Sequence, residues 1–197
     1  MRPTLRIAMA FALVTVSACR QAPQPPPKKA VSAPCQAAEA FIRQWLTGLG
    51  PGSYVFSNQP QLELPRSNPK NWRKYGTGQR ESISAPTDAL VDAAEKLTQG
   101  SAGRDCASVQ NLLSERHIPF EEPISEDGPQ QQEGNDGPWP VTFIQVSLPA
   151  VSADGSTAVL MASSVSGPEA GGGSFYLLQR QPSSGWQIIA AAELWIS

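Results

Sequence analysis

Histidine is almost missing from this 197-residue chain, which has only His117. A catalytic triad or metal site that needs an imidazole would have to use it. His117 stands near the end of a predicted helix, where a histidine is usually structural. No serine lies in a Gly-x-Ser-x-Gly elbow, and no Lys-Ser or Lys-Thr follows the three glycines at 171–173, as a phosphate-binding loop requires. We therefore predict that the protein is not an enzyme and has no cofactor and no metal site.

An excess of basic side chains is missing too. The chain has 15 Lys and Arg against 17 Asp and Glu. Removal of residues 1–18 would take away Arg2 and Arg6 and leave a net charge of 13 minus 17, which is −4. A mildly acidic domain lacks the clustered basic surface that nucleic acid needs. We therefore expect no nucleic-acid partner.

The N-terminal apolar run, residues 7–16, is too short to span a bilayer, because a spanning helix needs roughly 20 residues. Arg2 and Arg6 precede it, which gives the layout of a secretory signal. The run ends in Val16-Ser17-Ala18-Cys19, which resembles the lipobox of bacterial lipoproteins. This resemblance implies that residues 1–18 are a signal peptide and that Cys19 carries the lipid anchor. The alternatives are a plain secretory signal and an uncleaved anchor.

A membrane anchor at Cys19 would place the protein in the bacterial cell envelope, facing the periplasm or the cell surface. Arg20 follows the modified cysteine, which by analogy with enteric sorting rules favours the outer membrane over the inner. Residues 19–34 read as the lipidated cysteine and a Pro-rich tether of extended polyproline II, and residues 35–197 as one globular domain. With Cys19 lipidated, Cys35 and Cys106 remain, and an oxidising periplasm favours a disulfide between them over two separate thiols.

The order of elements predicts an α+β domain. Helical spacing of apolar residues covers 35–48, 87–100 and 105–119. Alternating apolar residues predict strands at 142–148 and, more briefly, at Gln61–Leu64. Further strands are predicted at 157–165, 174–180 and from 186 towards the C-terminus. The three glycines at 171–173 are predicted to form a mobile turn. We expect about three helices packed on one face of a C-terminal antiparallel meander sheet of three to five strands.

The stretch Trp72-Arg73-Lys74-Tyr75 interleaves aromatic and basic residues and is the candidate binding patch. Cations and aromatic faces together suit an anionic or glycan ligand. The alternative is a loop whose Trp72 and Tyr75 lie in the core beneath solvated charges. Residues 121–139 are acidic and are predicted to form a flexible loop, because they lack the spacing of a calcium-binding EF-hand.

The C-terminal part resembles a pattern of uncharacterised bacterial secreted proteins and lipoproteins. The pattern consists of Asp154-Gly155, Ala158-Val159-Leu160, Gly171-Gly172-Gly173, Phe175-Tyr176-Leu177-Leu178, Gly185-Trp186-Gln187-Ile188 and Trp195-Ile196-Ser197. The layout is also similar to the cystatin-like or NTF2-like cone folds. These resemblances imply no catalytic residue, since a shared fold does not fix function.

Three functions remain open at this point. The first is a non-enzymatic envelope lipoprotein that binds a protein partner, either as an assembly accessory or as an immunity-type inhibitor of a toxic effector. The second is a small-ligand-binding domain with an apolar cavity, and the third is an envelope hydrolase with an unfamiliar site. We expect the first.

Overall fold

The computed structural model describes residues 31–49, 53–57, 69, 71–76, 81–121, 141–167 and 170–196. The chain divides into two compact units, residues 1–30 and 31–197, and every described residue belongs to the second. Cys19, the expected signal, the expected strand at 61–64 and residues 122–139 of the expected acidic loop lie outside the described residues.

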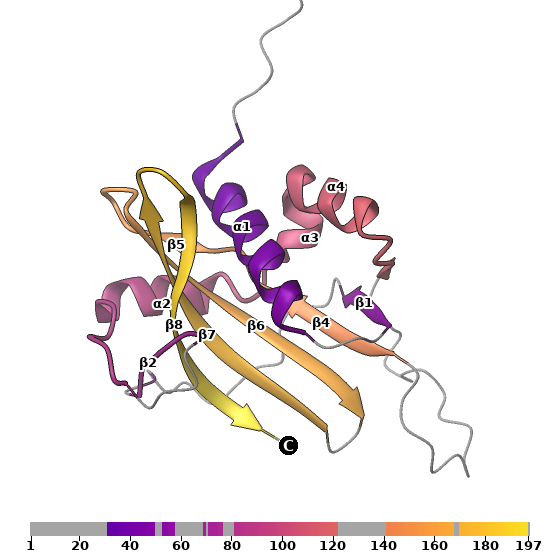
Figure 1. The fold of residues 1–197 in the computed structure, drawn as a ribbon. Coiled ribbons are helices and arrows are strands. Elements are labelled where there is room, and N and C mark those ends of the chain that lie inside the picture. Colours follow the sequence, from indigo (N-terminus) through magenta and orange to yellow (C-terminus); the bar gives the residue numbers. More distant parts are fainter. Residues whose placement is uncertain are drawn as a thin grey trace, which may run out of the picture. The chain divides into compact units, whose positions relative to one another are not determined.

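The second unit is an α+β fold, as the sequence predicts (Figure 1). Its helices are α1 (Ala33–Gly48), α2 (Asp88–Lys96), α3 (Ala102–Asp105) and α4 (Ala107–Glu115). Its strands are β1 (Tyr54–Ser57), β2 (Arg73–Lys74), β3 (Phe120–Glu121), β4 (Thr142–Val146), β5 (Ala150–Val151), β6 (Thr157–Gly167), β7 (Ala170–Gln181) and β8 (Gly185–Ile196). The four strands expected in the C-terminal half correspond to β4, β6, β7 and β8.

The three predicted helices form as α1, α2 and α4, and α3 is an additional one. Pro34 stands in the first turn of α1, where its missing N–H costs nothing, and the helix buries Phe41, Ile42 and Trp45. The helix expected at 105–119 forms as α4, and α3 is an additional short helix before it; the extended backbone of Cys106 (φ −123°, ψ 105°) separates the two. The short helix α3 therefore ends before Cys106, and α4 begins after it.

The sheet is larger than expected and mixed rather than purely antiparallel. Its eight strands run in the order β2-β8-β7-β6-β4-β1-β3, with β5 also paired to β6. The long strands β6, β7 and β8 are antiparallel, whereas β1 is parallel to both β4 and β3. The additional strands β1, β2, β3 and β5 have only two to four residues each. Such short strands carry too little alternation to be predicted.

Helices cover both faces of the sheet, whereas one face was expected. Ala158, Leu160 and Ala162 of β6 belong to a core shared with α1, α3 and α4. The intervening Val159 and Met161 belong to a second core, which contains residues of α2. Successive strand residues point to opposite faces, so α2 lies on the face opposite α1. The unbroken apolar run of β6 is typical of a strand buried on both faces.

The three glycines at 171–173 lie within β7, so the expected mobile turn at these residues is wrong. They pair with β6 on one side, and Gly172 and Gly173 also pair with the end of β8 on the other. Gly173 lies opposite Trp195, and a Cβ on Gly173 would overlap the Trp195 indole. A Cβ on Gly171 would lie 3.1 Å from the same ring. Glycine is needed here because an aromatic ring approaches the strand closely.

Candidate functional site

The candidate binding patch lies at one edge of the sheet. Arg73 and Lys74 form β2, which pairs with Ala191 and Ala190 of β8. On the other side of β2, the main-chain N–H of Lys74 donates a 3.0 Å hydrogen bond to the carbonyl of Glu81. The patch therefore lies on a hydrogen-bonded ladder, not on an isolated loop.

The basic and aromatic side chains of the patch have different surroundings. Arg73 and Lys74 are exposed, whereas Trp72 has 1% of its surface exposed and packs in the core beside α2. Lys74 Nζ lies 3.1 Å from Glu81 Oε2, and about half of each side chain is exposed. An exposed ion pair of this kind contributes at most about 1 kcal/mol. The Trp72 ring therefore stabilises the fold and does not meet solvent, while the two cations do.

Tyr75, the fourth residue of the patch, belongs to an aromatic cluster. Its ring lies edge-on to Tyr176, with 5.9 Å between the ring centroids. Tyr176 also contacts Phe41 and Trp45 of α1, at 4.8 Å and 6.4 Å. Burial raises the pKa of Tyr176, and the neighbouring Tyr75 raises it further. Burial likewise raises the pKa of Tyr75. Both hydroxyls are therefore neutral at physiological pH, and the cluster joins β7 to α1.

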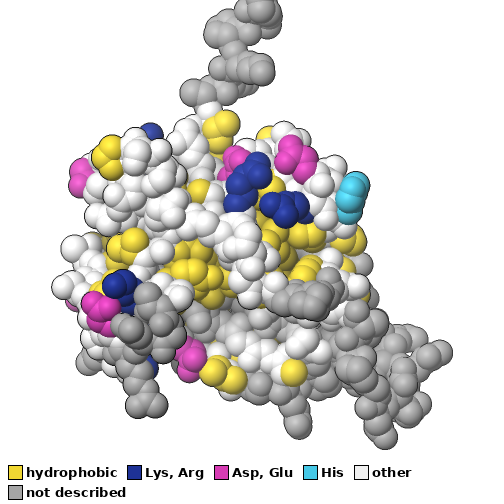
Figure 2. Space-filling model, in the orientation of Figure 1, with side chains coloured by type: hydrophobic (Ala, Val, Ile, Leu, Met, Phe, Trp, Pro, Cys, Tyr) yellow, Lys and Arg dark blue, Asp and Glu magenta, His cyan; other side chains and the backbone are white. Residues whose placement is uncertain are grey.

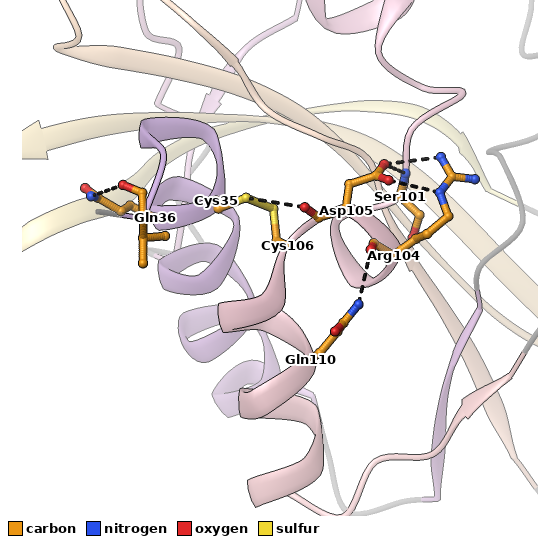
Figure 3. Close-up of a disulfide and its surroundings, with 8 residues drawn as sticks. Cys35, Gln36, Ser101, Arg104, Asp105, Cys106 and Gln110 are labelled. Atoms are coloured by element: carbon orange, nitrogen blue, oxygen red, sulfur yellow. Dashed lines mark hydrogen bonds and ion pairs between the residues drawn. A yellow bond between two sulfur atoms is a disulfide. The ribbon is translucent and has the colours of Figure 1, made fainter. Parts of the chain in front are cut away.

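The predicted disulfide between Cys35 and Cys106 is confirmed (Figure 3). The two Cα atoms are 5.4 Å apart, across 71 positions of sequence. Cys35 lies in the first turn of α1, and Cys106 is the residue that precedes α4. The bond therefore fastens the beginning of α1 to the junction of α3 and α4.

Polar contacts fix the same junction (Figure 3). The Asp105 carboxylate accepts hydrogen bonds from the Ser101 main-chain N–H at 3.2 Å and from Arg104 Nε at 3.0 Å. The hydrogen bond from Arg104 holds the pKa of Asp105 below its usual value. Gln110 of α4 donates a 3.1 Å hydrogen bond to the Arg104 carbonyl. The disulfide is thus attached to an ordered segment on the α3–α4 side.

His117 takes part in ending α4. Its φ is +55°, in the left-handed region, and its N–H donates to the Ser114 carbonyl at 3.1 Å. The next N–H, of Ile118, donates to the Leu113 carbonyl at 2.9 Å. This pair of hydrogen bonds is the Schellman motif that closes many helices. The exposed His117 therefore has a structural position, as a histidine at a helix end usually does.

Gln44 is a structural residue that the sequence does not reveal. From α1 it donates a 2.9 Å hydrogen bond to the Trp186 carbonyl, and it accepts one of 3.1 Å from the Ile188 N–H. The side chain thereby takes up main-chain hydrogen-bonding groups of β8 at Trp186 and Ile188. The residues of β8 that follow bond instead to Tyr75 and to β2. The helical pattern only assigns Gln44 to the polar face.

The face of the molecule that carries α1 shows hydrophobic side chains between charged ones (Figure 2). Three large hydrophobic residues of the described part are strongly exposed, namely Val31, Phe120 and Ile196, at 45%, 38% and 70%.

Within the described ranges, no group of three or more His, Cys, Asp or Glu side chains could hold a metal ion. None of the helices in the described part of the chain is long and apolar enough to cross a membrane.

Comparison with known proteins places the chain in no family: no family model, curated protein or solved structure matches it significantly.

Proposed function

We propose that the protein is a lipoprotein of the bacterial envelope, anchored through Cys19. The resemblance of residues 16–19 to a lipobox supports the anchor. The observation that carries the proposal is the Cys35–Cys106 disulfide, whose first cysteine follows Cys19 by 16 positions. Disulfides persist in oxidising compartments and are rare in the cytosol. A disulfide-bonded domain directly after such a signal fits the periplasmic or outer side of a membrane, and Arg20 favours the outer membrane.

The tether gives the domain reach. Residues 19–32, which precede α1, contain four prolines, and a Pro-rich chain extends by about 3.1 Å per residue. The domain would therefore work tens of ångströms from the lipid surface, where it can meet a soluble or membrane-bound partner.

The domain's role in this proposal is to bind a protein partner without catalysis, as an assembly accessory or an immunity-type inhibitor. The exposed cations of β2, Arg73 and Lys74, support a contact at this edge of the sheet. Ordered main-chain pairing to β8 holds them in place. A partner with acidic side chains would pair with them, and opposite charges across an interface provide specificity and fast association.

A capture experiment tests the partner. The mature, lipidated protein is used as bait for envelope and secreted fractions of the host, and bound material is identified by mass spectrometry. We expect one stoichiometric protein with the wild-type bait, and its loss with the double variant Arg73→Glu/Lys74→Glu. The matched control is Arg116→Glu/Arg180→Glu, which makes the same charge change at exposed positions elsewhere.

Two outcomes would count against the proposal. Capture that survives Arg73→Glu/Lys74→Glu would remove the β2 edge as the contact. A wild-type bait that captures no protein would contradict the partner and direct the search to small molecules and glycans.

A further inference from the structure

We propose that the domain undergoes thiol–disulfide exchange at Cys35, with Cys106 as the leaving and resolving sulfur. The inference rests on the different surroundings of the two halves of the disulfide, and it does not depend on the proposed partner.

Access differs between the two cysteines. Cys35 is partly exposed in the first turn of α1, whereas Cys106 has 0% of its surface exposed. Cys106 belongs to the buried core cluster that α1 and α4 share, which also contains Val109 and Leu112. Exchange requires an incoming thiolate to reach a sulfur atom. Of the two cysteines, Cys35 is therefore the one that retains solvent-exposed surface in the folded domain.

The reactivity of the two free thiols also favours Cys35 over Cys106. The thiolate form of a cysteine is favoured at a helix N-terminus and disfavoured in apolar surroundings. Once reduced, Cys35 would lie at the start of the 16-residue α1 and remain partly exposed. Cys106 would also adjoin a helix start, but among buried apolar side chains. Of the two free thiols, Cys35 is therefore the one that should react faster with a disulfide in solution, whereas the point of attack on the intact bond follows from access.

The exchange step needs no external oxidant, because one disulfide bond forms as another breaks. A low-molecular-weight thiol, as its thiolate, attacks Cys35 Sγ and forms a new sulfur–sulfur bond with it. The Cys35–Cys106 bond breaks, and its electron pair leaves on Cys106 Sγ, which takes a proton from solvent. In reverse, Cys106 attacks the mixed disulfide at Cys35, restores the bond and releases the thiol.

The wild-type protein provides the first test. The full mature chain, with its disulfide intact, is incubated with excess reduced glutathione under native conditions, quenched with acid and mapped by peptide mass spectrometry. We expect the glutathione adduct on Cys35. A first adduct on Cys106 at early time points, or complete resistance of the folded protein to glutathione, would overturn the proposal.

Single variants provide the second test. Cys106→Ser leaves Cys35 free, and Cys35→Ser leaves Cys106 free. We expect the Cys35 thiol to react with a chromogenic aromatic disulfide at least about tenfold faster than the Cys106 thiol in the folded proteins. In denaturant the two rates should become similar. Equal native rates, or a faster Cys106, would contradict the proposal; if either variant does not fold, the wild-type mapping decides.

Discussion

The Gln44 side-chain oxygen on α1 accepts a 3.1 Å hydrogen bond from the main-chain N–H of Ile188, 144 positions later in the chain. Its amide nitrogen donates to the Trp186 carbonyl in return. One glutamine thus forms with the β8 edge the two hydrogen bonds that a neighbouring strand would form. It joins the first helix of the domain to its last strand.

Replacing Gln44 by Ala should destabilise the domain. Two partly buried long-range hydrogen bonds would be lost, and each contributes about 1 kcal/mol. We expect the free energy of unfolding to fall by about 2 kcal/mol in urea titrations. The control is Gln36→Ala on the same helix, which loses only a local bond to Val31 and should cost less than about 0.5 kcal/mol. Equal effects of the two variants would show that the β8 contact does not matter.

Removal of the disulfide should have a larger effect. The bond closes a loop of 71 positions, and the chain-entropy account gives about 4 kcal/mol for a loop of that length. We expect the double variant Cys35→Ala/Cys106→Ala to be less stable than the oxidised wild type by about that amount. The reduced wild type should unfold close to the double variant. A loss of less than about 1 kcal/mol would mean that the bond does not stabilise the fold as this account requires.

The close approach of Trp195 to β7 predicts a position-specific effect of alanine. Gly173→Ala should cost about 1–3 kcal/mol, because the added methyl group overlaps the indole. Gly172→Ala, whose Cβ would have only ordinary contacts, should change the free energy of unfolding by less than about 0.5 kcal/mol. In a double-mutant cycle, Trp195→Ala should reduce the cost of Gly173→Ala. If the cost persists without the indole, the explanation is wrong.

Asp154 should make stability depend on pH in the acid range. The Ser152 hydroxyl and the Ser156 hydroxyl and N–H donate to its carboxylate and lower its pKa from 3.8 to about 2. Because the folded-state pKa lies below the unfolded value, this stabilisation is complete above the unfolded pKa. It is lost as the pH falls from there through about 2.

Urea titrations at about pH 5 and about pH 3 check this prediction. We expect the stability advantage of the wild type over Asp154→Asn to shrink at the lower pH. The control is the same comparison in a Ser152→Ala/Ser156→Ala background, which removes both hydroxyl donors to Asp154 and should weaken the change with pH. An advantage of Asp154 that does not depend on pH would contradict the role of its charge.

The sequence reveals those parts of the fold whose information is local. The stripe of Phe41, Ile42 and Trp45 is enough to predict α1, and the apolar runs of β6, β7 and β8 are enough to predict three strands. If Cys19 is assigned to the lipid anchor, Cys35 and Cys106 are the two cysteines left to form a disulfide. These features can be predicted because each depends on residues close in sequence or on the number of cysteines in the chain.

Features that depend on distant partners could not be predicted. β2 forms because Arg73 and Lys74 pair with the edge of β8, more than a hundred positions later in the chain. Nothing in the sequence of residues 72–75 indicates that pairing. From the sequence alone Gly173 is predicted to lie in a turn, because its close contact with the Trp195 indole becomes apparent only in the folded structure. The candidate patch shows the same limit, because its composition does not tell that Trp72 is buried while its neighbours are exposed.

The anchor at Cys19 is the central claim, and the mature N-terminus tests it most directly. The protein is extracted from host membranes and its N-terminal peptide is analysed by mass spectrometry, beside a Cys19→Ser variant. We predict a wild-type chain that begins at a lipid-modified Cys19, and a variant that is no longer lipidated. A wild-type chain that keeps residues 1–18, or that begins elsewhere with an unmodified Cys19, would contradict the account.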